Sequence, residues 1–146
     1  MKDFREINRV KLRSSGLRPT KQRMMISRVL FGKKRTFHFT IEELKKLIEK
    51  NFKQKISLAT LYNTVHAFKK RGYLKEIALN GNKTYFDTNT STHHHFYDED
   101  LEKLVDIKEN KIFVKNIPKS PEGKSIKSVE VMVRVASNNH NQKIVQ

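Results

Sequence analysis

Cysteine is absent from this chain of 146 residues. Its absence excludes disulfide bonds, cysteine-bound zinc and thiol catalysis. Long apolar runs are also missing, since none approaches the roughly 18 residues that a membrane-spanning helix needs. The first residues contain no apolar signal region, so we expect a cytoplasmic protein with no segment in the membrane.

Acidic residues are scarce: 15 Asp and Glu stand against 31 Lys and Arg, which gives a formal net charge of +16. Such an excess opposes compaction by self-repulsion and predicts a polyanionic partner. Nucleic acid is the first candidate and an anionic membrane surface is the second. Hydrophobic residues make up 36% of the chain, and a chain of this size can extend its core by dimerising.

The positive charge is distributed unevenly along the chain. Residues 1–75 contain 21 Lys and Arg but only five Asp and Glu, whereas residues 76–146 contain ten of each kind. The whole excess therefore lies in the first half. A basic module followed by a neutral one is typical of a polyanion binder joined to a second functional unit. The alternative is a lysine-rich composition whose side chains are only solvated.

Local signals predict four helices in the first half of the chain. They are expected at residues 3–14, 20–31, 40–50 and 57–72. The run from Thr40 to Glu43 is a capping box at the start of the third helix. Gly72 is the expected stop of the fourth helix. The buried stripe of the fourth helix is expected to consist of Leu58, Leu61, Val65 and Phe68.

After the fourth helix the pattern changes to that of strands. Residues 73–79 and 83–87 flank Asn80 and Gly81, which is a strong hairpin signal. Further strands are expected at 104–107 and at 129–135, where valines alternate with other residues. Helices followed by a hairpin are the order of a winged helix-turn-helix, in which the last helix enters the major groove of DNA.

The face of the fourth helix opposite its expected core carries small and polar residues: Ala59, Thr60, Tyr62, Asn63 and His66. Tyr62 can stack on thymine methyl groups and Asn63 can pair with adenine. The helix N-terminus at Ser57 favours phosphate. Basic residues upstream can neutralise phosphates or reach a narrow minor groove, and these are Arg13, Arg18, Lys21 and Arg23. The alternative is an ordinary helical bundle with a solvated polar face.

Three of the six histidines are consecutive: His93, His94 and His95. In an extended chain, His93 and His95 point to one side and His94 points to the other. Two imidazoles at this spacing can hold one metal ion. The alternative is a solvated loop.

Carboxylates near the triplet strengthen the metal interpretation. Asp87 ends the predicted hairpin and Asp106 follows the triplet. Zn(II), Fe(II) and Mn(II) accept mixed nitrogen and oxygen ligands. If His38 of the basic module joins the set, the metal ties the two modules together. Taken alone, His38 is typical of a surface residue beside a helix.

Several stretches resemble the ferric uptake regulator family. They are Gly16–Arg23, His38–Leu44 and Ser57–Thr64, of which the last is the most specific, and the resemblance covers roughly residues 10–110. Two further stretches, Thr84–Phe96 and Pro121–Arg134, are similar to the iron response regulator branch of that family. They extend the resemblance to about residue 136.

The resemblance implies a homodimer with an α+β fold. Residues 1–87 would form an N-terminal winged helix-turn-helix DNA-binding domain, and residues 88–146 a small α/β dimerisation domain that senses metal or haem. It also implies a transcriptional regulator of iron homeostasis, and not an enzyme, that binds A/T-rich palindromes in double-stranded DNA.

The resemblance carries over to particular residues. A regulatory site for divalent iron, manganese or zinc matches His38, Asp87, His93, His95 and Asp106. Tyr62 matches a thymine-contacting tyrosine, and Arg18 matches a basic position in the minor groove. Because some members of the branch sense haem, the candidate haem residues are His93, His94 and His95.

The chain departs from the family pattern in three places. Both CxxC pairs are absent, so there is no cysteine-bound structural zinc and the dimer must hold without it. A second metal site lacks its ligands, because Thr92, His94 and Phe113 stand where it would need His, Asp and Glu. Asn63 stands where iron-uptake regulators often carry arginine, which indicates a different operator.

Two other functions compete with this interpretation. A metallohydrolase would need a His-x-His-x-Asp-His run, and the spacing after His95 does not match it. A sequence-neutral nucleic-acid-binding protein with an incidental His run remains the main alternative. It predicts equal affinity for scrambled DNA and a steep dependence on salt.

Overall fold

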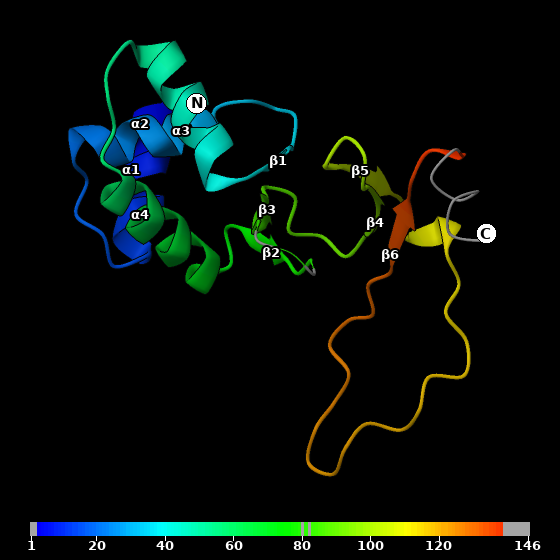
Figure 1. Ribbon diagram of the computed structural model, residues 1–146. Coiled ribbons are helices and arrows are strands. Elements are labelled where there is room, and N and C mark those ends of the chain that lie inside the picture. Colours follow the sequence, from blue (N-terminus) through cyan, green and yellow to red (C-terminus); the bar gives the residue numbers. More distant parts are fainter. Residues whose placement is uncertain (1–2, 80, 82, 139–146) are drawn as a thin grey trace. The chain divides into compact units, whose positions relative to one another are not determined.

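The computed structural model describes residues 3–79, 81 and 83–138. The chain divides into two compact units, residues 1–90 and residues 91–146. The first unit contains, in order, α1 (Phe4–Ser14), α2 (Lys21–Phe31), β1 (His38–Phe39), α3 (Ile41–Phe52), α4 (Leu58–Arg71), β2 (Lys75–Ile77) and β3 (Tyr85–Asp87). The second unit contains β4 (His94–Asp98), β5 (Lys103–Ile107), the 3₁₀ helix η1 (Glu109–Lys111) and β6 (Met132–Val135), as Figure 1 shows.

All four predicted helices are present, and a side chain caps the N-terminus of each one. The capping residues are Asp3, Thr20, Thr40 and Ser57. The predicted capping box is confirmed: Thr40 accepts from the Glu43 amide, and the Glu43 carboxylate accepts from the Thr40 amide. α4 ends at Arg71, and the predicted stop, Gly72, follows it as the C-cap with a φ of 93°, a left-handed conformation that side chains disfavour.

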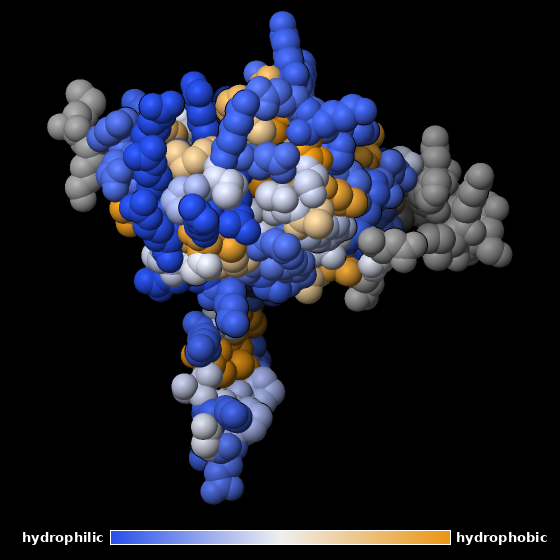
Figure 2. Space-filling model, turned by 90° about the vertical axis from the view of Figure 1, so that its left-hand side faces the viewer, coloured by the Kyte–Doolittle hydropathy of each residue, from blue (hydrophilic) through white to orange (hydrophobic). Residues whose placement is uncertain are grey.

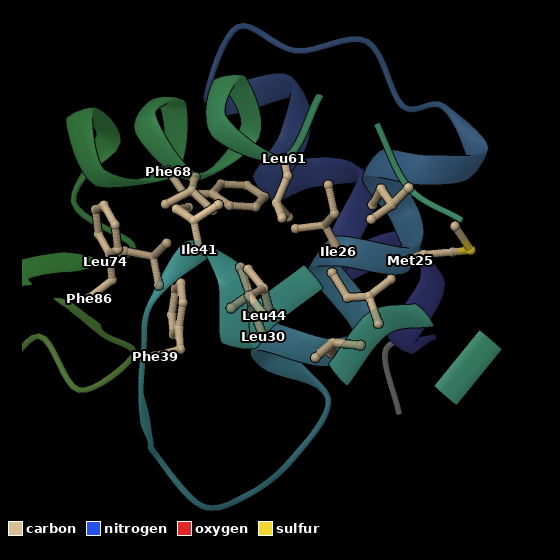
Figure 3. Close-up of a cluster of buried hydrophobic side chains, with 14 of the residues drawn as sticks. Met25, Ile26, Leu30, Phe39, Ile41, Leu44, Leu61, Phe68, Leu74 and Phe86 are labelled. Atoms are coloured by element: carbon tan, nitrogen blue, oxygen red, sulfur yellow. The ribbon is translucent and has the colours of Figure 1, made fainter. Parts of the chain in front are cut away.

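A cluster of buried apolar side chains from α1–α4, β1 and β3 holds the first unit together (Figure 3). Leu61, Val65 and Phe68 of α4 are fully buried, as predicted. Leu58 was wrongly predicted to join them, since it is 48% exposed. The first turn of α4 is uncovered, and the buried stripe begins only at Leu61. Thr64 is buried beside it and satisfies its hydroxyl by donating to the Thr60 carbonyl.

The sheet of the first unit has the order β1-β3-β2, and both pairs are antiparallel. The predicted hairpin is confirmed as β2 and β3, although each strand is shorter than expected. Its turn signal falls partly on Asn80, which lies outside the described residues. β1 was not predicted. Its pairing with β3 places His38 opposite Asp87 and Phe39 opposite Phe86.

In the second unit β4 lies between β5 and β6, antiparallel to β5 and parallel to β6. The strand predicted at 104–107 is confirmed as β5. The strand predicted at 129–135 begins only at Met132. The Val131 amide donates to the imidazole Nδ1 of His94, so this side chain replaces the backbone partner that would continue the ladder. Residues 112–131 form no helix or strand.

Helices of the described chain are short and polar. The longest, α4, has 14 residues, and no described helix is long and apolar enough to cross a membrane.

Candidate metal centre and nucleic-acid interface

One histidine–carboxylate pair lies in the first unit. The β1–β3 register brings His38 Nε2 to 3.2 Å from Asp87 Oδ2. Asp87 is buried, and its Oδ1 also accepts from the Asn89 amide at 2.8 Å. Phe37 and Thr88 flank the pair and are joined by hydrogen bonds: Thr88 N and Thr88 Oγ1 donate to the Phe37 carbonyl, and Phe37 N donates to Thr88 Oγ1. Backbone pairing therefore fixes both members of the pair.

A second set lies in the other unit. The Nε2 atoms of His93 and His95 each lie 3.3 Å from Asp106 Oδ1. His95 stands opposite Asp106 in the β4–β5 register, and the two imidazole centroids are 4.4 Å apart. The candidate ligand atoms of these three residues lie within 4.8 Å of one another. Such a compact set of two nitrogens and a carboxylate oxygen suits a divalent transition metal.

The hydrogen bond of His93 prepares its ring for a metal. Its Nδ1 lies 2.7 Å from the Ser91 carbonyl. Because a carbonyl only accepts, Nδ1 must carry the proton, and the neutral ring presents Nε2 as the nitrogen that binds metals. This carbonyl contact is the usual way in which proteins orient a metal-ligating histidine.

His94 differs from its two neighbours. Its Nδ1 accepts from the Val131 amide at 2.8 Å, so the neutral ring carries its proton on Nε2. The ring is buried and links β4 to the residue before β6. The triplet therefore splits into a pair directed at Asp106 and one histidine, His94, whose ring accepts a hydrogen bond from the Val131 amide.

Lys75 is a neighbour of the first pair that the sequence analysis missed. The β2–β3 register places it opposite Asp87. Burial lowers the pKa of Lys75 from its usual 10.5, and the nearby Asp87 carboxylate partly opposes that shift. The sequence could have revealed this neighbour, because pairing the two predicted strands outward from their turn places Lys75 opposite Asp87.

The side chains predicted to read DNA lie on α4 or at its N-cap, and most of them are exposed. Ser57, Ala59, Tyr62 and Asn63 are exposed, and Thr60 is half-buried. Upstream, Arg13, Arg18 and Lys21 are exposed, while Arg23 is half-buried and donates to the Arg18 carbonyl at 2.9 Å. The Ser57 amide donates to Gln22 of α2 at 3.3 Å, which fixes the start of α4. Figure 2 shows a largely hydrophilic face of this helical unit, interrupted by small hydrophobic spots.

Comparison with known proteins identifies the class. The model of the ferric uptake regulator family matches residues 14–135, and the chain belongs to this family. Its members are transcription regulators and not enzymes. Among individual relatives, the chain is similar to the peroxide-responsive repressor PerR of Staphylococcus aureus, with 36% identity over 96 residues. That match covers 66% of this chain and 63% of the repressor, which is less than two thirds of the repressor's length.

Solved structures share the fold. The ferric uptake regulator of Pseudomonas aeruginosa with manganese aligns with a TM-score of 0.66 and 19% identity, over 90% of this chain and 98% of that one. The ferric uptake regulator of Vibrio cholerae aligns with a TM-score of 0.65 and 20% identity, over 89% and 99%. These likenesses confirm the predicted α+β fold.

Proposed function

We propose that this protein is a metal-responsive transcriptional regulator that binds double-stranded DNA as a homodimer. The observation that carries the proposal is the split ligand set. His38 and Asp87 are paired in the basic unit, while His93 and His95 converge on Asp106 in the other unit. A metal ion held by all five residues would couple sensing to DNA binding.

The chemistry of the ligands and the short connection between the two ligand sets support one shared site. Three imidazole nitrogens and two carboxylates suit Fe(II), Mn(II) or Zn(II). Five residues separate Asp87 from His93, so their Cα atoms lie at most about 21 Å apart at full extension. One relative of the same fold, with a TM-score of 0.59 and 22% identity, is described as a zinc-bound manganese uptake regulator.

The proposed target is an A/T-rich palindrome. Tyr62 and Asn63 would read thymine and adenine in the major groove. Ser57, Ala59 and Thr60 would lie close to the DNA backbone and bases. Arg13, Arg18 and Lys21 would contact phosphates or the minor groove. A homodimer would place its two α4 helices about 34 Å apart, one turn of DNA. We further propose that the protein controls iron homeostasis and is of the iron response regulator type. We also propose that it acts in the cytoplasm.

Haem is the alternative effector, with His93, His94 and His95 as its candidate ligands. The Val131 amide occupies Nδ1 of His94, and His93 and His95 already face a carboxylate. This arrangement favours a metal ion over haem.

A DNA-binding titration tests the proposal. The wild type is titrated onto an A/T-rich palindrome and a scrambled duplex, without effector and with Fe(II), Mn(II), Zn(II) or haem. One metal should change the palindrome affinity by about 5- to 150-fold, the usual range of allosteric coupling. The variant His93→Ala with His95→Ala should lose this response and keep its fold, whereas the exposed control Glu109→Gln should respond like the wild type.

Two results would contradict the proposal. The first is a palindrome affinity that no metal changes, or that stays metal-dependent in the double variant. The second is equal affinity for the scrambled duplex with a steep salt dependence, which would favour the sequence-neutral binder.

A further inference from the structure

His66 has no part in the proposed function, yet it contacts a residue that does. It lies on α4 one turn after Tyr62, and the two rings stack with centroids 6.1 Å apart and an interplanar angle of 17°. Both residues are exposed. A stacked partner restricts the rotamers of Tyr62, and this lowers the conformational entropy that the tyrosine loses when it contacts a base.

His66 also contacts the strand that carries a proposed metal ligand. Its ring meets the Phe86 ring edge-on, with centroids 6.2 Å apart and an interplanar angle of 82°. Phe86 is buried and immediately precedes Asp87 in β3. His66 is thus in contact with the readout side chain on one side and with β3 on the other.

The second strand of the pair reinforces this contact. Phe86 stacks on Phe39 with centroids 5.6 Å apart, and Phe39 immediately follows His38 in β1. Since successive side chains of a strand point to opposite faces, the β1–β3 ladder carries His38 and Asp87 on one face and the two phenylalanines on the other. A change in the spacing of the His38–Asp87 pair therefore moves the aromatic face that supports His66.

The surroundings leave room for such a movement. A cavity of about 120 Å³ borders Tyr62, His66 and Phe86. Phe86 is itself held by its stack on Phe39. Displacement of the aromatic face can thus be taken up by the rings of His66 and Tyr62.

We propose that His66 is a positioning residue that couples the metal state of the β1–β3 ladder to thymine recognition by Tyr62. The inference rests on the proposed function, in which His38 and Asp87 bind the metal and Tyr62 contacts thymine. Metal binding fixes the spacing of the His38–Asp87 pair in the ladder, and Phe86 then fixes the position of the His66 ring. His66 in turn holds Tyr62 in the conformation that contacts the thymine methyl group.

The test compares His66→Ala, which removes the stack, with His66→Phe, which keeps an aromatic ring there. Lys70→Ala is the control, because it removes an exposed side chain of the same helix that is not part of the stack. Affinities are measured on a palindrome and on the same duplex with uracil in place of thymine, with and without the metal that changes the palindrome affinity of the wild type. Metal affinity is measured separately in the absence of DNA, and folding is checked by circular dichroism.

The wild type should prefer thymine over uracil, and more strongly with metal bound. His66→Ala should bind metal as the wild type does but lose this metal-dependent preference. Its affinity for the thymine palindrome should fall about 3- to 10-fold, the range of one lost aromatic contact. His66→Phe should restore the preference, and Lys70→Ala should weaken both duplexes equally.

The outcomes separate the two proposals. If the wild type responds to metal and His66→Ala keeps its full metal-dependent thymine preference, the role of His66 is wrong and the proposed function stands. A His66→Phe variant that behaves like His66→Ala also overturns it, because stacking would not be the cause. A wild type with no metal response overturns the proposed function and this inference with it.

Discussion

His93 and His94 are neighbours in the chain, but hydrogen bonding gives their neutral rings opposite tautomers. Nδ1 donates to the Ser91 carbonyl in His93 and accepts from the Val131 amide in His94. The sequence predicts that the two rings point to opposite faces of an extended segment. It does not predict the tautomers, because the partner of His94 comes from a residue 37 positions away.

His94→Ala should destabilise the protein without removing a metal ligand. The variant leaves the Val131 amide without its acceptor, so the free energy of unfolding should fall by about 1–3 kcal/mol. Urea denaturation measures this loss, and a metal titration should give an affinity close to that of the wild type. A loss of metal binding as large as that of His93→Ala would place His94 among the ligands instead.

Glu49 should contribute a pH-dependent stability. Hydrogen bonds from the Lys45 ammonium and the Ile56 amide lower its pKa from the usual 4.5. A lowered carboxyl pKa adds stability above pH 4.5, and this stability is lost as the pH falls through the folded-state pKa. Denaturation of the wild type and Glu49→Gln from pH 7 to pH 3 should give a difference that is largest at pH 7. A difference independent of pH would show that ionisation of Glu49 does not matter.

Elements with local signals could be predicted, and elements that depend on distant partners could not. The helices begin at capping residues such as Thr40, and α4 ends before Gly72, because these signals act within one turn. β1 has two residues and exists only through its pairing with β3. The start of β6 depends on the His94 side chain, and the exposure of Leu58 depends on where the core ends. The candidate ligands were predictable as residue types, whereas their convergence depends on strand register.

Thr40→Ala should show how much the capping box stabilises α3. The variant removes the acceptor for the Glu43 amide, and such losses cost about 0.5–2 kcal/mol. Thermal or urea denaturation measures the effect. Glu43→Gln is the matched control, since an amide oxygen can still accept from the Thr40 amide, and it should cost less. Equal losses in the two variants would assign the effect to the Glu43 charge at the helix N-terminus.

At the scale of the whole molecule, the hydrophobic core belongs to one unit. Among the described residues, every buried apolar side chain lies between Leu12 and Phe86. In residues 91–138 the buried side chains are the three consecutive histidines. That unit also exposes large apolar residues, including Leu101, Val105, Phe113 and Ile126. These side chains are available to pack against a second copy in the proposed homodimer.

A fragment of residues 1–90 should therefore fold without the rest of the chain. It keeps the whole apolar core, so it should show a helical circular dichroism spectrum and one cooperative thermal transition. The fragment of residues 91–146 should remain largely unfolded as a monomer, because it buries little apolar surface. Gradual, non-cooperative melting of the first fragment would show that its core needs the second unit.

The short connection between Asp87 and His93 has a consequence for the proposed metal site. Its first residues are held by hydrogen bonds, Thr88 to Phe37 and Asn89 to Asp87. Once either set of ligands has bound a metal ion, the connection would hold the other set near it at an effective concentration in about the millimolar range. Avidity would then make a responsive sensor from two sets of ligands that each bind weakly. Flexible residues inserted after Thr90 would lower the metal affinity with every ligand still in place.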